Sequence, residues 1–243
     1  MFRAPHFVTG EFEPHHAFLD DETYGKALDS LVKACSDVMI ESADGSKVFL
    51  GRRKVEPQPD WWFVGGRARP GDTTQEAAAR NVRRELGLTI EAARFEVVAS
   101  YSFAWRMRQQ APRENGTADI STVHTLRLTV EEAGAVQLDP DEYAESRWIA
   151  LDEILTGDFH PALKQAAADL QAMRAFRRLQ AAVATDGTDA EVAAAARALV
   201  THHGAGTREG AKVIFDAAAG TYEFRERGKA EGGGDDAVRE AAR

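Results

Sequence analysis

The chain contains one cysteine, Cys35, among its 243 residues, so no disulfide can form within it. This scarcity is typical of proteins from a reducing interior, and we predict a cytoplasmic location. Long apolar runs are also missing. None approaches the roughly 18–20 residues of a membrane span, and the first residues lack the apolar core of a secretory signal. The net charge of −9 argues against broad nucleic-acid binding, so we expect neither membrane nor nucleic acid as a partner.

What is present is the composition of a globular protein, with 44% apolar and 28% charged residues. The charge is uneven, because residues 1–159 account for the whole net charge, whereas residues 160–243 hold equal numbers of basic and acidic side chains. The second part is also rich in alanine. We therefore predict one domain over residues 1–158, a C-terminal α-helical extension over residues 159–225 and a disordered tail over residues 226–243.

Local patterns predict short strands mixed with a few helices. Residues 20–34 have the pattern of a helix capped by Asp20 or Asp21. Residues 36–53 predict a β-hairpin around the turn at residues 44–45, and residues 94–107 and 121–130 predict further strands. Two long helices and a closing hairpin are expected beyond residue 160. This mixture is typical of an α/β or α+β sandwich.

One stretch, WWFVGGRARPGDTTQEAAARNVRRELGL at residues 61–88, joins a strand, a glycine turn and a helix. Gly65 and Gly66 end the aromatic strand and let the backbone come close to a ligand, with a carbonyl able to face a cation. Thr73 or Thr74 is the expected N-cap of the helix, and Gly87 is its expected C-cap.

The helix of this stretch is expected to bury one face. Ala78, Val82 and Leu86 recur at the spacing of a buried stripe. Glu85 lies beside that stripe, one turn after Asn81, so both side chains are expected to point into one pocket. Because Mg²⁺ takes one or two carboxylates and fills its other positions with water and phosphate oxygens, one helix carboxylate and one from elsewhere would be enough.

These residues resemble the signature of the Nudix hydrolases, G-x(5)-E-x(7)-R-E-U-x-E-E-x-G-U, in which U is a bulky aliphatic residue. The positions that match in register are Gly66, Arg80, Val82, Glu85, Gly87 and Leu88. Asp72 is a shorter replacement for the first glutamate. Asn81 and Arg84 depart from the pattern, since the family usually has metal-binding or catalytic glutamates there. The resemblance covers about residues 18–158 and implies an α/β/α sandwich with a mixed sheet.

The similarity extends to the GDP-mannose mannosyl hydrolase branch, which also lacks those two glutamates. That branch displaces the nucleoside diphosphate at the anomeric carbon of the sugar. By position, the resemblance implies a nucleotide–sugar pocket lined by Asp37, Arg53, Arg67 and Arg80. It also implies Mg²⁺, with Mn²⁺ as a substitute, held by the Gly66 carbonyl and Glu85.

The general base is sought in the loop before the last strand of the domain. The mannosyl hydrolase branch has Gln-His where this chain has Glu142-Tyr143. A tyrosine with an ordinary pKa near 10 is a poor base at neutral pH, so we assign Tyr143 to substrate binding. Glu142 is expected either to complete the metal site in place of glutamine or to act as the base. Together with Glu85 and Arg53 it forms the predicted catalytic set.

The sequence thus predicts a Mg²⁺-dependent hydrolase of a nucleoside diphosphate linked to a sugar or a similar group, a small-molecule partner. The alternative is an inactive Nudix-like protein that senses nucleotides and signals through its C-terminal helices. A pocket that gathers Glu85, Glu142 and three arginines would favour the enzyme. An exposed basic patch would favour the sensor, and its residues would be Arg174, Arg177 and Arg178. The apolar side of these helices predicts packing on the domain or a homodimer interface.

Overall fold

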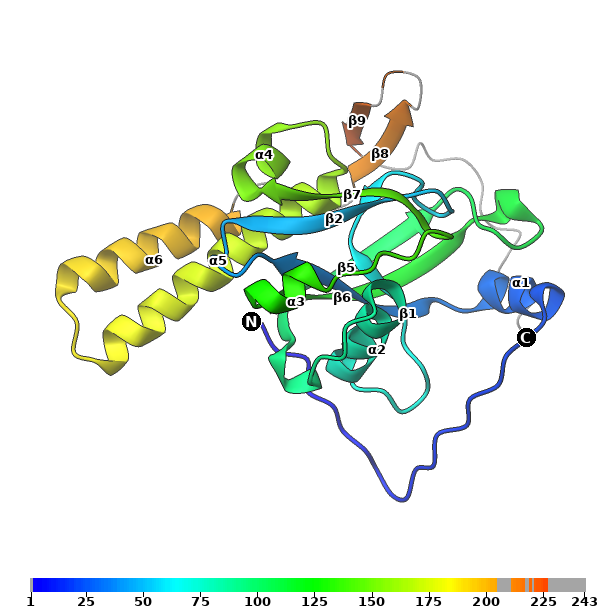
Figure 1. Ribbon diagram of the computed structural model, residues 1–243, viewed down its shortest axis with the longest axis horizontal. Helices are drawn as coiled ribbons and strands as arrows, with labels where there is room; N and C mark the ends of the chain where they lie inside the picture. Colours follow the sequence, from blue (N-terminus) through cyan, green and yellow to red (C-terminus); the bar gives the residue numbers. More distant parts are fainter. Residues whose placement is uncertain (1, 205–210, 217–218, 220, 227–243) are drawn as a thin grey trace, which may run out of the picture.

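The structure, a computed structural model, describes residues 2–204, 211–216, 219 and 221–226 (Figure 1). Its centre is a seven-stranded sheet. The strands of this sheet are β1 (Lys33–Glu41), β2 (Lys47–Arg53), β3 (Trp61–Trp62), β4 (Val64–Arg67), β5 (Glu96–Trp105), β6 (Thr117–Arg127) and β7 (Tyr143–Ala150). Two further strands, β8 (Ala211–Asp216) and β9 (Thr221–Glu226), form a separate antiparallel hairpin, which confirms the predicted closing hairpin.

The sheet is mixed. β1 and β6 pair in parallel, whereas the other strand pairs in the described residues are antiparallel. The order is β3-β2-β1-β6-β5, with β4 beside β1 and β7 beside β2. One edge of β1 pairs with β6 along its whole length, and the other edge pairs first with β4 and then, at its end, with β2. This division places Gly66 opposite Ser36 and Gly65 opposite Asp37 at the start of β1.

The helices begin and end where the sequence supplies caps. They are α1 (Asp21–Ser30), α2 (Thr74–Leu86), α3 (Val130–Gly134), α4 (Leu151–Thr156), α5 (Pro161–Ala184) and α6 (Asp189–Gly204), with short 3₁₀ turns η1 (Ala92–Arg94) and η2 (Arg113–Asn115). Thr73 caps α2 in a capping box with Glu76, and Gly87 ends it with a left-handed φ of 70°. Asp20 caps α1 as predicted. That helix ends at Ser30, earlier than expected, because the chain from Lys33 onward pairs with β6.

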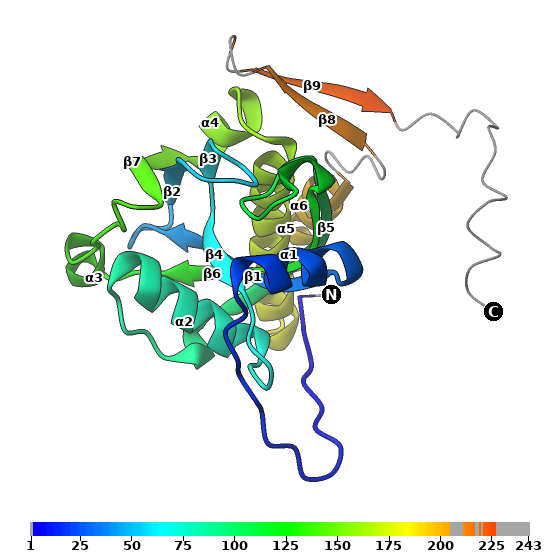
Figure 2. The ribbon, with the colours of Figure 1, turned by 90° about the vertical axis from the view of Figure 1, so that its right-hand side faces the viewer.

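Helices cover both faces of the sheet, as Figure 2 shows with the strands lying between α2 and α5. On one face the stripe of Ala78, Val82 and Leu86 is fully buried against the sheet. On the other face α4 and α5 supply the apolar side chains. Those from α5 are Leu163, Ala166, Ala167, Leu170 and Met173. Each buried leucine contributes roughly 1.5–3 kcal/mol, so both layers stabilise the fold. The predicted α/β/α sandwich is confirmed.

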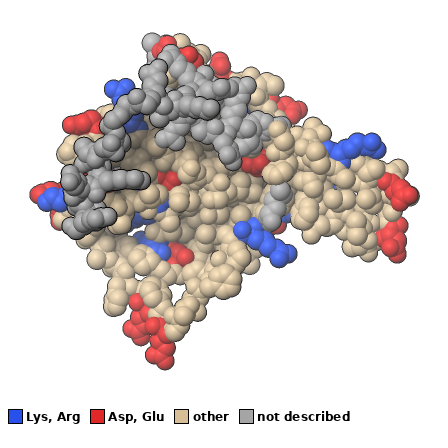
Figure 3. All heavy atoms as spheres, turned by 180° about the vertical axis from the view of Figure 1, so that it is seen from behind, with Lys and Arg blue, Asp and Glu red and all other residues tan. Residues whose placement is uncertain are grey.

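The C-terminal helices divide into a packed part and a projecting part. The first half of α5 shares one core with the sheet. The domain boundary predicted at residue 159 stays a prediction, and this shared core does not support it. α6 packs on α5 and buries one of its own residues, Ala195. Together α6 and the second half of α5 project from the rest of the molecule (Figure 3). Two arginines of the expected basic patch form ion pairs with the sheet instead, Arg174 with Glu41 and Arg177 with Glu96.

None of the described helices has the length and apolarity that crossing a membrane requires. The disordered tail predicted for residues 226–243 lies, beyond Glu226, outside the described residues.

Candidate active site

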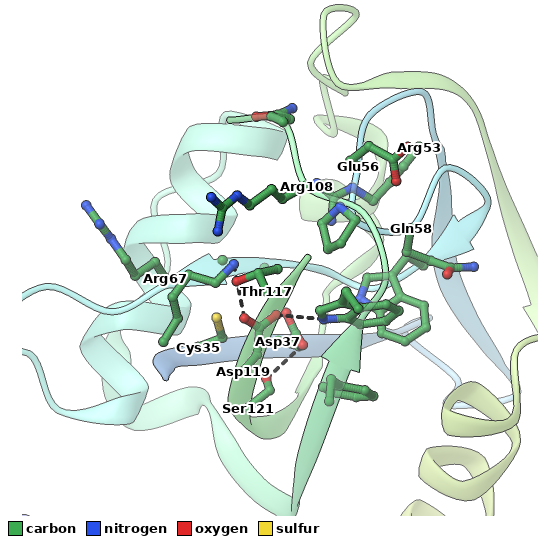
Figure 4. Close-up of a pocket in the computed structure, with 18 of the residues that line it drawn as sticks. Cys35, Asp37, Arg53, Glu56, Gln58, Arg67, Arg108, Thr117, Asp119 and Ser121 are labelled. Carbon is green, nitrogen blue, oxygen red and sulfur yellow. Dashed lines mark hydrogen bonds and ion pairs between the residues drawn. The ribbon is translucent and has the colours of Figure 1, made fainter. Parts of the chain in front are cut away.

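A cavity of about 250 Å³ lies at the end of the sheet where β1 and β6 begin (Figure 4). It is lined by residues of α1 and α2, of the six strands β1 to β6, and of the loops after β2, after β5 and before β7. Its basic side chains are Lys33, Arg53, Arg67, Arg84 and Arg108, and its carboxylates are Asp37, Glu56, Asp119 and Glu142. Its aromatic wall consists of Tyr24, Trp62, Phe103 and Trp105. The cavity therefore offers charges of both signs beside surfaces on which a flat ring could stack.

The floor of the cavity is built by alternate residues of the parallel strands β1 and β6. The Ser121 hydroxyl donates to the Asp37 carboxylate at 2.7 Å. The carboxylate of Asp119 accepts from the Trp105 indole at 2.8 Å and lies 3.0 Å from the Lys33 ammonium. Because residues two apart on a strand share a face, the parallel register gathers all of these polar groups on one side of the sheet.

Asp37 is buried in this floor. Burial raises its pKa to about 7, although the hydrogen bond from Ser121 and the charge of Arg53 act in the opposite direction. A Cβ atom on Gly65 would lie 2.1 Å from a carboxylate oxygen of Asp37, so only glycine leaves room for it. A carboxyl group with this pKa exchanges its proton near neutral pH, which is a property of functional sites more often than of structural ones.

Arg53 and Glu142 meet at one side of the cavity, with the guanidinium 3.8 Å from the carboxylate. Arg53 ends β2, and its neighbour Arg52 points to the other side, where it donates to Glu145 at 3.1 Å. Arg53, which the resemblance assigned to the pocket, therefore lies on the cavity side of the strand. Two of the three predicted catalytic residues, Arg53 and Glu142, therefore lie together.

The other two predicted pocket arginines diverge. Arg67 lines the cavity, with its guanidinium 4.9 Å above the ring of Tyr24. Arg80 instead donates to the Asp72 carboxylate at 2.7 Å and to the backbone carbonyl of Arg67 at 3.1 Å. Arg80 thus ties α2 to the loop before it and is not among the described residues that line the cavity. Its predicted contact with substrate gains no support from this position.

Glu85 lies behind the cavity with a side chain that is fully buried. Its carboxylate accepts from the backbone N–H of Gly65 at 3.3 Å, from the Tyr143 hydroxyl and from the Arg84 guanidinium. Burial raises the pKa of Glu85, while the charge of Arg84 and the Tyr143 hydrogen bond oppose that rise. Arg84 also donates to the Gly65 carbonyl at 3.2 Å. The last carboxylate of the box is therefore satisfied by donors of the chain itself.

Tyr143 is a buried partner of Glu85, not a residue of the cavity wall. Burial raises the pKa of its hydroxyl, so this group stays protonated and acts as a donor at neutral pH. A Cβ atom on Gly51 would lie 2.4 Å from the ring, so the glycine in β2 makes room for the tyrosine. The structure thus places Tyr143 where it positions Glu85, and its predicted substrate contact stays a prediction.

A family model described as the NUDIX domain matches residues 34–170, which is over half of the chain. The chain belongs to the Nudix family. The matched residues include the box, Arg53, Glu142 and the first part of α5. The match also confirms the predicted Nudix-type fold and supports the prediction of a Nudix hydrolase.

Relatives with established names differ in what they act on. An RNA pyrophosphohydrolase of Teredinibacter turnerae is 28% identical over 120 residues, which are 47% of this chain and 70% of the relative. Among solved structures, the MutT protein of Methanosarcina mazei Go1 has 19% identity and a TM-score of 0.47, with 59% of this chain and 95% of that chain covered. An Ap4A hydrolase of C. elegans has 16% identity and a TM-score of 0.43, with 59% and 98% covered. The finer resemblance to the mannosyl hydrolases stays a prediction.

Nudix hydrolases generally use divalent metals, so the predicted ligands of this chain can be tested for fit. The Gly66 carbonyl accepts from the Asn81 side-chain amide at 2.9 Å, Glu85 accepts the three donors named above, and Glu142 faces Arg53. In the described part of the chain no group of three His, Cys, Asp or Glu side chains could hold a metal ion. Because N–H groups face the oxygens that would bind a cation, this donor set does not fit the predicted site. Mg²⁺ and Mn²⁺ remain predictions from the resemblance alone.

Sequence reasoning missed the side chains that β6, β5 and the start of β1 contribute. These are Lys33, Trp105, Asp119 and Ser121. A signal existed, because Asp119 and Ser121 alternate with Ala118 and Ile120 at the start of β6, and the structure buries the two polar residues while Ile120 is exposed. Two buried strands with polar residues on one face point to a shared polar site.

Proposed function

We propose that this Nudix protein hydrolyses a nucleoside diphosphate linked to a sugar or a similar group. The observation that carries the proposal is the convergence of Arg53, Arg67 and Arg84 with Glu142 around one cavity. Guanidinium groups bind phosphate oxygens through paired N–H donors, so three of them match a diphosphate. At about 250 Å³ the cavity is just below the roughly 300–1,000 Å³ of typical small-molecule sites, so we expect it to enclose the phosphates and one adjoining group.

The aromatic wall supports a ring-bearing ligand. Trp105 stacks on Phe103 with ring centroids 5.0 Å apart, and Trp62 packs edge-on against both. The indole of Trp105 is also held by Asp119, so its ring orientation is fixed before a ligand arrives. A fixed aromatic surface next to phosphate-binding arginines favours a nucleotide over an inorganic diphosphate.

For the chemical step we propose attack of water at the anomeric carbon of the sugar. The bond between that carbon and the bridging phosphate oxygen breaks, and its electron pair leaves with the nucleoside diphosphate. Glu142 accepts the proton of the attacking water, and Arg53 beside it neutralises charge that develops on the leaving phosphate. Tyr143 cannot replace Glu142 in this role, because its hydroxyl stays protonated at neutral pH.

The test is phosphorus NMR of a panel of nucleotide sugars incubated with the full chain in ¹⁸O-labelled water, with and without Mg²⁺. We expect an unlabelled nucleoside diphosphate, since the label would go to the sugar. A nucleoside monophosphate with sugar phosphate, one of them labelled, would replace carbon attack by pyrophosphate cleavage, the kind of bond that the name of the Teredinibacter relative indicates. Glu142→Gln should lose activity by about 10²-fold or more. Glu145→Gln, which removes a carboxylate paired with Arg52 outside the cavity, is the matched control.

A second candidate is a Nudix protein that binds nucleotides without turning them over. It is favoured by one observation, the saturation of Glu85 by donors of the chain itself. Absence of turnover with every nucleotide sugar, together with binding that Arg53→Ala abolishes, would select this candidate. Loss of both turnover and binding would reject both functions.

A further inference from the structure

Arg84 stands at the position where the family pattern has a carboxylate for a metal, and its guanidinium points inward. The same nitrogen, Nη2, donates to the Gly65 carbonyl at 3.2 Å and to the carboxylate of Glu85. That nitrogen would lie 3.1 Å from a Cβ atom placed on Gly66. One positive group therefore contacts a backbone carbonyl at the end of β4 and the buried carboxylate of α2, two kinds of oxygen that typically bind a cation.

Asn81 strengthens this arrangement. Its amide nitrogen donates to the Gly66 carbonyl at 2.9 Å and to the Ser36 carbonyl at 3.2 Å, and its side chain is fully buried. Its amide oxygen accepts from Arg80 at 3.2 Å, which fixes the orientation of the amide. The two departures from the box thus act together, because each directs N–H groups at oxygens that would otherwise be free to bind a metal.

We infer that Arg84 takes the place of the divalent cation and that this protein binds the phosphates of its ligand without a metal. The inference rests on the proposed function for the identity of the ligand. A metal at Glu85 would have to displace a guanidinium that is already hydrogen-bonded to a buried carboxylate, and it would meet the positive charge of Arg84 at close range.

Arg84 keeps the capacity to bind phosphate while it holds Glu85. Its side chain is 48% exposed and lines the cavity, whereas that of Glu85 is fully buried. A guanidinium has five N–H donors in a planar fork, so one edge can stay on Glu85 while the other faces a ligand. Arg53 and Arg67 line the same cavity and supply the remaining positive charge.

The first experiment measures Mn²⁺ binding to the full chain by electron paramagnetic resonance, without nucleotide. The wild type and Arg84→Glu are compared, with Arg83→Glu as the matched control, because Arg83 is exposed on the same helix. We expect Arg84→Glu to bind Mn²⁺ at least about tenfold more tightly than the wild type, since it restores a carboxylate beside Glu85. Arg83→Glu should not change the affinity. Tight Mn²⁺ binding by the wild type that Glu85→Gln abolishes would overturn the inference.

The second experiment follows the intrinsic tryptophan fluorescence, to which Trp62 and Trp105 of the cavity wall contribute, while ADP or GDP is added in EDTA or in Mg²⁺. We expect the wild type to bind the nucleotide with equal affinity in the two buffers. Arg84→Gln should lower that affinity by about tenfold or more in EDTA. Binding by the wild type that requires Mg²⁺ would overturn the inference. Absence of binding in both buffers would count against the nucleotide ligand of the proposed function, whereas the Mn²⁺ result would still decide the role of Arg84.

Discussion

Strand β1 carries two buried carboxylates, Asp37 at its middle and Glu41 at its last residue, and their surroundings shift their pKa values in opposite directions. Asp37 has one hydrogen-bond donor, the Ser121 hydroxyl, and its pKa is raised to about 7 chiefly by burial. At Glu41 burial acts in the same direction, but Thr125, Arg127 and Arg174 outweigh it and lower the pKa. Both side chains lie on the face that α5 covers. The surroundings of a carboxylate, not its depth, decide which one can change charge near neutral pH.

The difference separates a structural end of the sheet from a functional one. Glu41 accepts from Thr125 at 2.6 Å and from Arg127 at 2.9 Å, and Arg174 brings α5 to the same group. This end fixes the helix to the sheet. At the cavity, four residues earlier in β1, the carboxyl of Asp37 keeps hydrogen-bonding capacity for a ligand.

The largest effect is expected from Glu41→Ala. The substitution removes the carboxylate that pairs with Arg174, which keeps only its hydrogen bond to the Gly45 carbonyl among the contacts described, and it removes a tie between α5 and β1. We therefore expect a loss of about 3 kcal/mol in the free energy of unfolding. Urea denaturation measures it. A loss below about 1 kcal/mol, the range of surface ion pairs, would mean that this end of the strand is not a structural clamp.

Asp37→Asn should raise the free energy of unfolding, the opposite of Glu41→Ala. Between about pH 4 and about pH 7 the folded protein keeps a proton on Asp37 that the unfolded chain releases, so wild-type stability falls as pH rises through this window. The pKa change limits the gain in the free energy of unfolding to about 4 kcal/mol. We expect a gain of about 2 kcal/mol at about pH 8, because the amide loses part of the Ser121 hydrogen bond. Thermal unfolding at about pH 5 should show little gain. Equal gains at both pH values would contradict the raised pKa.

Tyr143→Phe tests the hydrogen bond that the Tyr143 hydroxyl donates to Glu85 behind the cavity. The variant removes the hydroxyl that donates to Glu85 and leaves a buried carboxylate with one donor fewer, which should lower the unfolding free energy by about 1.5 kcal/mol. Urea denaturation provides the measurement, with Tyr101→Phe as a control for loss of another buried tyrosine hydroxyl, the one that donates to Asp169 at 2.5 Å. If only the control were destabilised, Tyr143 would not be holding Glu85.

The smallest effect is expected from Arg177→Ala, one turn along α5 from Arg174. Both Arg177 and its partner Glu96 are about half exposed, so solvent screens the pair and the change should stay within about 0.5 kcal/mol. The same denaturation series detects it. A loss as large as that of Glu41→Ala would show that α5 is held by its whole arginine row and not by one buried carboxylate.

Much of the local structure followed from the sequence because short-range rules govern it. The caps at Asp20, Thr73 and Gly87 were predicted from residue type and position. These features depend on neighbours within a few residues, for which one sequence is sufficient.

The remaining features depend on contacts between distant segments. The register of β1 on β6 brings Asp119 and Ser121 into the cavity from more than 80 residues away, and no local pattern specifies that register. The new partners of Asn81 and Arg84 depend on where the Gly65 and Gly66 carbonyls point. For α5 the apolar side chains predicted either packing on the domain or a dimer interface, and the contacts with the sheet that select the first are between distant segments.

The place of α5 in the core also has a consequence for biosynthesis. The strands and the box helix leave the ribosome before residues 161–173, so one face of the sheet stays uncovered while those later residues are still being added. Apolar surface of this kind attracts chaperones and other nascent chains. The domain is therefore complete only once α5 has been synthesised, and a chain that ends near residue 158 would expose one side of its sheet.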